Sequence, residues 1–279
     1  MSETPNSLYL DLMKQCLTRH AFGEPYREVI YRRGSIGRAV MAPLQALLRL
    51  KGYTLCSKDA FSREARAEGL DWPPEAETMI GLKRLDNIQD CVIDILNRTV
   101  PGDLIETGVW RGGACIFMRA VLKCYGDTQR TVWVADSFQG VPAPDPARYA
   151  ADASEVRKEA FHKFDQLAVS EEQVRANFQR YGLLDDQVRF LKGWFRDTLP
   201  SIPVAQHFSL IRLDGDLYES TWDALTNLYP RLSPGGYCLI DDYGGIPACR
   251  QAVEDYRLKN SILAPITPVD RTGVFWRND

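Results

Sequence analysis

Carboxylates follow two apolar segments in the last third of the chain, and their grouping predicts metal chemistry. Asp214 and Asp216 flank Gly215 after one apolar run, and Asp241 and Asp242 follow the next. Several carboxylates brought together without basic partners would repel one another. A hard divalent cation relieves that repulsion, and oxygen ligands suit Mg²⁺ or Mn²⁺. The alternative is that these acids cap the helices that follow them, because Asp is a good N-cap.

A glycine-rich run earlier in the chain predicts a site for a cationic, nucleotide-like cofactor. The run holds an acid, a threonine and three glycines: Glu106, Thr107, Gly108, Gly112 and Gly113. A dinucleotide site would show G-x-G-x-x-G, whereas this loop reads G-x-x-x-G-G after an acid. An acid would repel a pyrophosphate but attract the cationic end of S-adenosylmethionine (SAM), so the run favours SAM over NAD. Asp136 ends the next strand, where a carboxylate can bind ribose hydroxyls.

These residues fall at the ends of segments whose pattern predicts a mostly parallel, Rossmann-like α/β sheet. Short apolar strands alternate with helix-length segments from Asp103 onward. The expected strands are 103–107, 131–136, 188–192, 208–214, 236–241 and 272–276, and the expected helices are 112–124, 171–181, 219–230 and 247–258. Carboxyl ends of parallel strands meet at one edge of a sheet, so the acids are expected to converge there.

The chain is expected to divide into a helical N-terminal extension over 1–100 and a cofactor-binding domain over 101–279. The extension includes an expected helix at 77–98 and is poor in strand signals. The basic residues between 27 and 51 indicate a solvated helix face, with a dimer surface or a contact to an acidic substrate group as alternatives. Residues 143–168 interrupt the alternation directly after a strand end, which predicts a lid over the site.

The composition excludes several other classes of protein. The 279 residues are 45% hydrophobic and 25% charged with a net charge of −3, so no basic nucleic-acid-binding domain is indicated. The longest apolar stretch is shorter than the about 20 residues of a membrane span, and the first residues lack a signal-peptide pattern. The 7 cysteines are scattered without a C-x-x-C pair, which favours reduced thiols and a cytoplasmic protein.

Six stretches in order resemble the macrocin O-methyltransferase family, the metal-dependent sugar O-methyltransferases of antibiotic biosynthesis. They are TMIGLKRLDNIQ (78–89), DLIETGVWRGGACIFM (103–118), ADSFQGVP (135–142), GWFRDTLP (193–200), RLDGDLYESTWDAL (212–225) and GGYCLIDDYG (235–244). The resemblance covers about residues 75–276. It implies a class I SAM methyltransferase fold with a helical lid, a homodimer or larger assembly, and an acceptor hydroxyl on a deoxysugar of a glycosylated natural product.

The resemblance also assigns roles to residues. It implies that Asp214, Asp241 and Asp242 bind the metal and that Glu106 and Asp136 hold SAM. It further implies that the cofactor pocket is lined by Met79, Ile80, Ser137 and Phe138. The acceptor is the weakest inference, because the first 75 residues match least and substrate contacts are expected there.

Methyl transfer to a hydroxyl requires a base, and Asp216 is the preferred candidate. A bound cation depresses the proton affinity of its ligands, so Asp214 is poorly suited to accept a proton. The weaker candidates are His20, His162 and His207. Three other readings stay open: a methyltransferase for a small catechol, an NAD-dependent oxidoreductase, and a non-catalytic SAM-binding scaffold.

Overall fold

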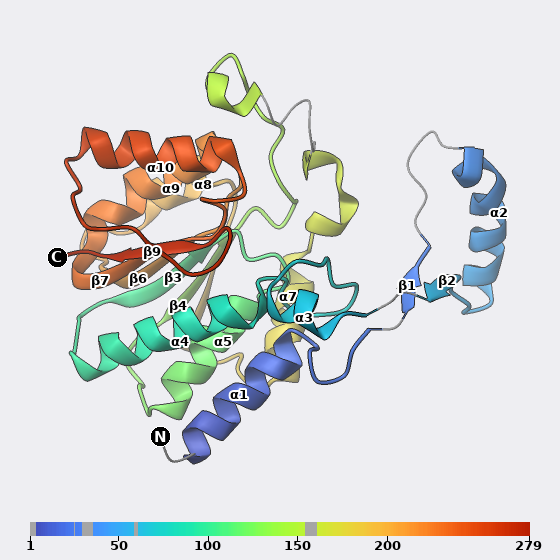
Figure 1. The fold of residues 1–279 in the computed structure, drawn as a ribbon, viewed down its shortest axis with the longest axis horizontal. Helices are drawn as coiled ribbons and strands as arrows, with labels where there is room; N and C mark the ends of the chain where they lie inside the picture. Colours follow the sequence, from blue (N-terminus) through green and yellow to red (C-terminus); the bar gives the residue numbers. More distant parts are fainter. Residues whose placement is uncertain (1–3, 25, 30–35, 59–60, 154–160) are drawn as a thin grey trace.

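A seven-stranded sheet forms the centre of the protein (Figure 1). The structure is a computed structural model and describes residues 4–24, 26–29, 36–58, 61–153 and 161–279. The strands are β3 (Asp103–Thr107), β4 (Val132–Asp136), β5 (Val188–Lys192), β6 (Phe208–Leu213), β7 (Leu232–Ile240), β8 (Thr267–Pro268) and β9 (Val274–Arg277). Their order is β5-β4-β3-β6-β7-β9-β8. The predicted mostly parallel α/β sheet is confirmed, with β9 antiparallel to β7 and β8 antiparallel to β9.

The strand order reverses beside β3, which pairs in parallel with β4 on one side and β6 on the other. In open α/β sheets ligands bind outside the carboxyl ends of the strands at such a switch point. Glu106 in β3 is in register with Arg212 in β6, so the two side chains share one face of the sheet. The topology therefore brings the glycine-rich turn and the carboxylate clusters to one edge.

Helices cover both faces of the sheet (Figure 1). One face packs against α1 (Pro5–Leu17), α4 (Gly81–Asn97), α5 (Gly113–Cys124) and α7 (Glu171–Arg180), and the other against α8 (Phe195–Thr198), α9 (Tyr218–Leu228) and α10 (Pro247–Lys259). Leu104 belongs to the first core and Ile105 to the second, as strand alternation requires. The 3₁₀ turns are η1 (Ala150–Asp152), η2 (Phe161–Lys163), η3 (Asp165–Leu167), η4 (Leu199–Ser201) and η5 (Tyr229–Arg231).

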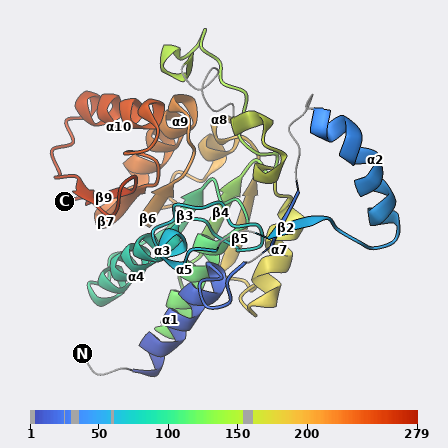
Figure 2. The ribbon, with the colours of Figure 1, turned by 45° about the vertical axis from the view of Figure 1, so that its right-hand side comes forward.

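The described residues 26–29 and 36–58 form an arm that stands away from the sheet and its helices (Figures 1 and 2). It consists of β1 (Tyr26–Glu28), α2 (Ile36–Leu50) and β2 (Cys56–Lys58), and the chain returns through α3 (Arg63–Ala67). The two strands pair with each other in an antiparallel ribbon. Sequence analysis did not predict this ribbon, because each strand has only three residues and neither shows an apolar alternation. Among the described helices, none is long and apolar enough to cross a membrane.

Candidate active site

A cavity of about 600 Å³ opens at the carboxyl ends of the central strands. Its wall contains most of the residues singled out in the sequence: Met79, Ile80, Glu106, Gly108, Asp136, Ser137, Asp214, Asp216, Asp241 and Asp242. Thr107, Gly112, Gly113 and Phe138 were also predicted to bind cofactor, but they are not among the lining residues. One enclosure therefore contains residues from both predicted sites, the glycine-rich turn and the carboxylates.

The three carboxylates predicted as metal ligands lie together. Asp214 directly follows β6, and Asp241 and Asp242 directly follow β7. One oxygen from each of the three lies within 4.8 Å of the others. Among the described residues this is a group of oxygen donors close enough together to bind a single hard cation.

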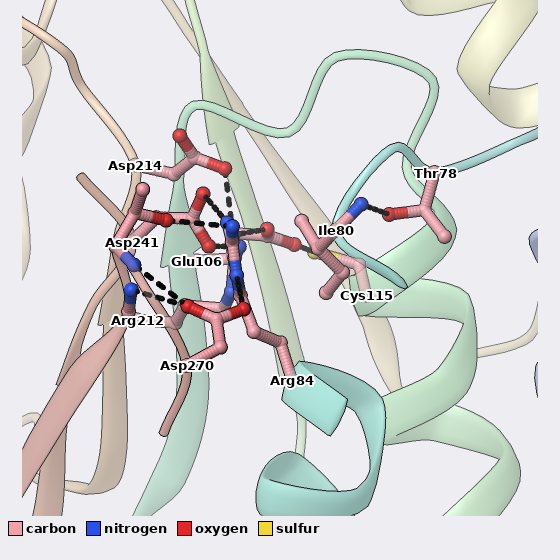
Figure 3. A network of polar contacts seen from close by, with 11 residues as sticks. Thr78, Ile80, Arg84, Glu106, Cys115, Arg212, Asp214, Asp241 and Asp270 are labelled. Carbon is pink, nitrogen blue, oxygen red and sulfur yellow. Dashed lines mark hydrogen bonds and ion pairs between the residues drawn. The ribbon is translucent and has the colours of Figure 1, made fainter. Parts of the chain in front are cut away.

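A buried arginine, Arg212, and a half-buried one, Arg84, lie against this group (Figure 3). Arg212 donates to Glu106, to Asp214 Oδ2 at 2.9 Å and to Asp241. Arg84, from α4, donates to the other oxygen of Asp241. The expectation that the carboxylates lack basic partners is therefore wrong. The signal was present in the sequence, because Arg212 is the one charged residue within the mostly apolar strand FSLIRL.

The arginines compensate the carboxylates unequally. Burial raises the pKa of Asp241, but Arg212 and Arg84 outweigh it and hold that pKa below its usual value. Burial and then neighbouring acids raise the pKa of Asp242 and of Asp214 well above the usual value. Asp242 Oδ2 is buried and has no hydrogen-bond partner among the described residues. An unpaired buried carboxylate oxygen is costly unless a cation or donor meets it, so the residues present fit a divalent metal.

The glycine-rich turn lies beside this group of acids. Gly108 has a φ of 82°, and a Cβ at this position would lie 1.7 Å from the carbonyl oxygen of Asp214. Only glycine allows β3 to approach β6 so closely at this point. A Cβ on Gly113 would lie 2.6 Å from the carbonyl oxygen of Glu77, and Gly113 does not line the cavity. Of the two, only Gly108 is placed to touch a cofactor, and Gly113 serves packing.

Asp136 joins the loops after β3 and β4. Its Oδ2 accepts the N–H of Val109 at 2.7 Å, and its Oδ1 accepts the N–H of Phe138 at 2.7 Å. Burial raises its pKa, and the backbone donors of Phe138, Val109 and Trp110 oppose that rise. The carboxylate lines the cavity, so it is placed both to shape the loops and to meet a ribose.

Replacing Asp136 by alanine should weaken SAM binding at least tenfold, about 1.4 kcal/mol. The substitution removes the carboxylate from the cavity wall and releases the two loop N–H groups that it accepts. Calorimetric titration with SAM measures the effect, with the exposed Asp186→Ala as the matched control. An affinity equal to that of the wild type would contradict the assignment.

Glu106 is buried between an arginine and a thiol. It accepts a hydrogen bond from Arg212 and one from Cys115 Sγ at 2.8 Å, and it also lines the cavity (Figure 3). Burial raises its pKa, and the charge of Arg212 opposes that rise. Sequence analysis identified the acid but neither of its two partners.

The candidate bases differ in their access to the cavity. Asp216 lines the cavity and has a φ of 59° just before α9. His162 lies in η2 but is not among the lining residues, and neither are His20 and His207. His207 directly precedes β6, so it lies at the amino ends of the strands, whereas the acids lie at their carboxyl ends. The positions of these residues thus favour Asp216.

An aromatic wall, which was not recognised in the sequence, lines part of the cavity. It includes Trp72, Trp110 and Phe164 from three separate segments. Trp72 meets Phe164 edge-on with ring centroids 5.6 Å apart, and Trp110 Nε1 donates to the carbonyl oxygen of Gln166 at 2.9 Å. Part of the predicted lid, 143–168, thus lines the cavity, and residues 154–160 within it lie outside the described residues.

Comparisons with known proteins agree on one family. Residues 6–278 match the family described as Macrocin-O-methyltransferase (TylF). The 8-demethyl-8-(2,3-dimethoxy-alpha-L-rhamnosyl)-tetracenomycin-C 4'-O-methyltransferase of Streptomyces olivaceus is 54% identical over 100% of this chain and 95% of its own length. The demethyldecarbamoylnovobiocin O-methyltransferase of Streptomyces niveus is 49% identical over 99% and 95%. The solved structure of the O-methyltransferase NovP has a TM-score of 0.82 at 47% identity, covering 98% of this chain and 99% of that one.

Proposed function

Because the chain belongs to the macrocin O-methyltransferase family, and is therefore a SAM-dependent O-methyltransferase, we propose that it methylates a deoxysugar hydroxyl of a glycosylated natural product. A relative that is 54% identical along the whole chain is named for a 4'-O-methyltransferase acting on a rhamnosyl tetracenomycin. The proposal includes a divalent metal, Mg²⁺ or Mn²⁺, held by Asp214, Asp241 and Asp242.

The unpartnered oxygen of Asp242 is the observation that carries the metal proposal. It lies in a group whose three oxygens are within 4.8 Å of one another, and two arginines contact Asp241 but leave Asp242 Oδ2 without a donor among the described residues. A bound divalent cation would lower the pKa of an acceptor hydroxyl and help orient it. Two neighbouring hydroxyls of a sugar suit such a site, because hard cations take oxygen ligands.

In this proposal, side chains of the protein bind SAM and accept the proton of the acceptor hydroxyl. Asp136 and Glu106 hold SAM, with Met79 and Ile80 against it in the same cavity. Asp216 accepts the proton of the acceptor hydroxyl from outside the metal-binding trio. Holding methyl donor and acceptor oxygen in line in one enclosure removes much of the entropic barrier to transfer.

We propose that residues 143–168 form the lid over the acceptor. Arg148 pairs with Glu219 at 2.7 Å, which attaches the beginning of this segment to α9. Asp152 is fully buried and accepts the N–H groups of Tyr218 at 2.7 Å and Glu219 at 3.2 Å. These contacts fasten the segment to the helix that begins two residues after Asp216.

We propose that the protein assembles as a homodimer, and exposed apolar side chains on the arm support this proposal. Val40, Leu44 and Leu47 recur at helical spacing on α2 and are 66%, 44% and 56% exposed. Apolar side chains in such a stripe ordinarily pack against a partner, and a second copy of the chain is the partner proposed here. The mass of the protein in solution distinguishes a dimer from a monomer.

The acceptor proposal predicts which molecule is methylated. With SAM and Mg²⁺, the enzyme should transfer one methyl group to a rhamnosylated polyketide and none to the same polyketide without its sugar. Mass spectrometry of the product, with fragmentation, locates the methyl on the sugar or the aglycone. Methylation of the aglycone, or of a simple catechol in place of the glycoside, would contradict the sugar acceptor and favour the catechol alternative.

A further inference from the structure

One guanidinium touches carboxylates of both halves of the cavity. Arg212 is 3% exposed and donates through Nη1 to Glu106 and Asp214 and through Nη2 to Asp241 (Figure 3). Glu106 lies on β3 two residues before Gly108, in the half assigned to SAM. Asp214 and Asp241 belong to the half assigned to the metal.

Arg84 provides an internal comparison, because it serves only one half. It donates to Asp241 through Nη1, to Asp270 at 2.7 Å through Nε and to Thr272 at 2.6 Å through Nη2. Among the described residues, no hydrogen bond or ion pair joins Arg84 to Glu106. Both arginines are mostly buried, yet only Arg212 joins the two halves.

The contacts of Arg212 with carboxylates of both halves depend on the shape of its guanidinium group. A guanidinium is planar and holds its N–H donors in a fixed fork, whereas a lysine ammonium is a compact point charge on a flexible stem. The fork at Arg212 therefore fixes three carboxylates relative to one another. Lysine would keep the positive charge and lose this geometry, so it separates positioning from charge.

We propose that Arg212 is a positioning residue that aligns the SAM-binding acid with the metal-binding acids, so that both ligands depend on it. This rests on the proposed function, because it assumes SAM at Glu106 and a divalent metal at the aspartate trio. It goes beyond that function by assigning one side chain, which is not among the residues lining the cavity, to the relative placement of methyl donor and acceptor site.

The test compares Arg212→Lys with Arg84→Lys. Calorimetry measures the affinity for SAM, and Mn²⁺ electron paramagnetic resonance measures the affinity for the metal. Arg212→Lys should lose at least about tenfold in both affinities, within the 10–100-fold range typical of outer-shell partners. Arg84→Lys should weaken Mn²⁺ binding and leave SAM affinity unchanged. The proposed role of Arg212 would be contradicted if Arg212→Lys kept the wild-type affinity for SAM, for Mn²⁺ or for both. It would also be contradicted if Arg84→Lys lost as much SAM affinity as Arg212→Lys.

A second pair of variants keeps Arg212 in place in case Arg212→Lys does not fold. Glu106→Gln and Asp136→Asn each remove one negative charge from the SAM half, but only Glu106 contacts Arg212. Glu106→Gln should weaken Mn²⁺ binding several-fold, and Asp136→Asn should leave it unchanged. Equal effects of the two variants on Mn²⁺ affinity would contradict the proposed role of Arg212. A wild-type protein that binds no Mn²⁺ would instead refute the proposed metal site itself.

Discussion

Asp242→Asn should abolish methyl transfer, with a loss of roughly a thousandfold or more, while SAM affinity stays at the wild-type value. The expected loss reflects the several kcal/mol of transition-state stabilisation that a catalytic metal supplies. Asp242 is the better test of the trio than Asp241, because Asp241 already has arginines on both of its oxygens. Substituting Asp241 would remove one acidic partner from each of the two arginines and so mix two effects.

The measurement is single-turnover methyl transfer together with SAM titration by calorimetry. Asn has nearly the shape of Asp and places no charge in the buried site, so the substitution should not lower the melting temperature of the metal-free protein. Asp186→Asn makes the same change at an exposed position and should behave as wild type. Retained turnover in Asp242→Asn, or a parallel loss of SAM binding, would contradict its role as a metal ligand.

Asp216→Asn should lose roughly 10²–10⁴-fold in kcat, the usual contribution of a general base, while SAM and Mn²⁺ still bind. Asp216 lines the cavity beside the trio, and its charge contributes to the raised pKa values of Asp214 and Asp242. Its φ of 59° lies in the left-handed region, which Asn tolerates better than most other residues. The Asn substitution therefore removes the base and retains the turn.

Three measurements on Asp216→Asn separate loss of the base from loss of the site. Turnover should fall, and the affinities for SAM and for Mn²⁺ should both stay at the wild-type values. Asp214→Asn is the matched comparison and should lose Mn²⁺ binding as well. Normal turnover in Asp216→Asn would show that another group accepts the proton.

The parallel sheet could be predicted because each strand is a short apolar run between helix-length segments. The turn at Gly108 and the acids after β6 and β7 followed from that sheet, since strand ends share an edge. The β1–β2 ribbon could not be predicted, because its strands have only three residues each and β2 is exposed throughout, which leaves no alternating pattern. Gly112 and Gly113 show another limit: glycines kept for packing look the same in sequence as glycines kept for a ligand.

The arginine contacts depend on long-range geometry that one sequence does not reveal. Arg212 is in register with Glu106 through the β3–β6 pairing, and this proximity follows only once the sheet order is known. Arg84 reaches Asp241 from a helix more than a hundred positions earlier in the chain, and no spacing rule connects them. The aromatic wall is similar, because Trp72 and Phe164 meet only after the fold is complete.

Turnover after metal removal tests the central claim most directly. Wild-type enzyme treated with EDTA and exchanged into metal-free buffer should bind SAM but transfer no methyl group to its glycosylated acceptor. Adding Mg²⁺ or Mn²⁺ should restore transfer in the wild type and fail to restore it in Asp242→Asn. Full turnover of the metal-depleted enzyme would contradict a metal at Asp214, Asp241 and Asp242.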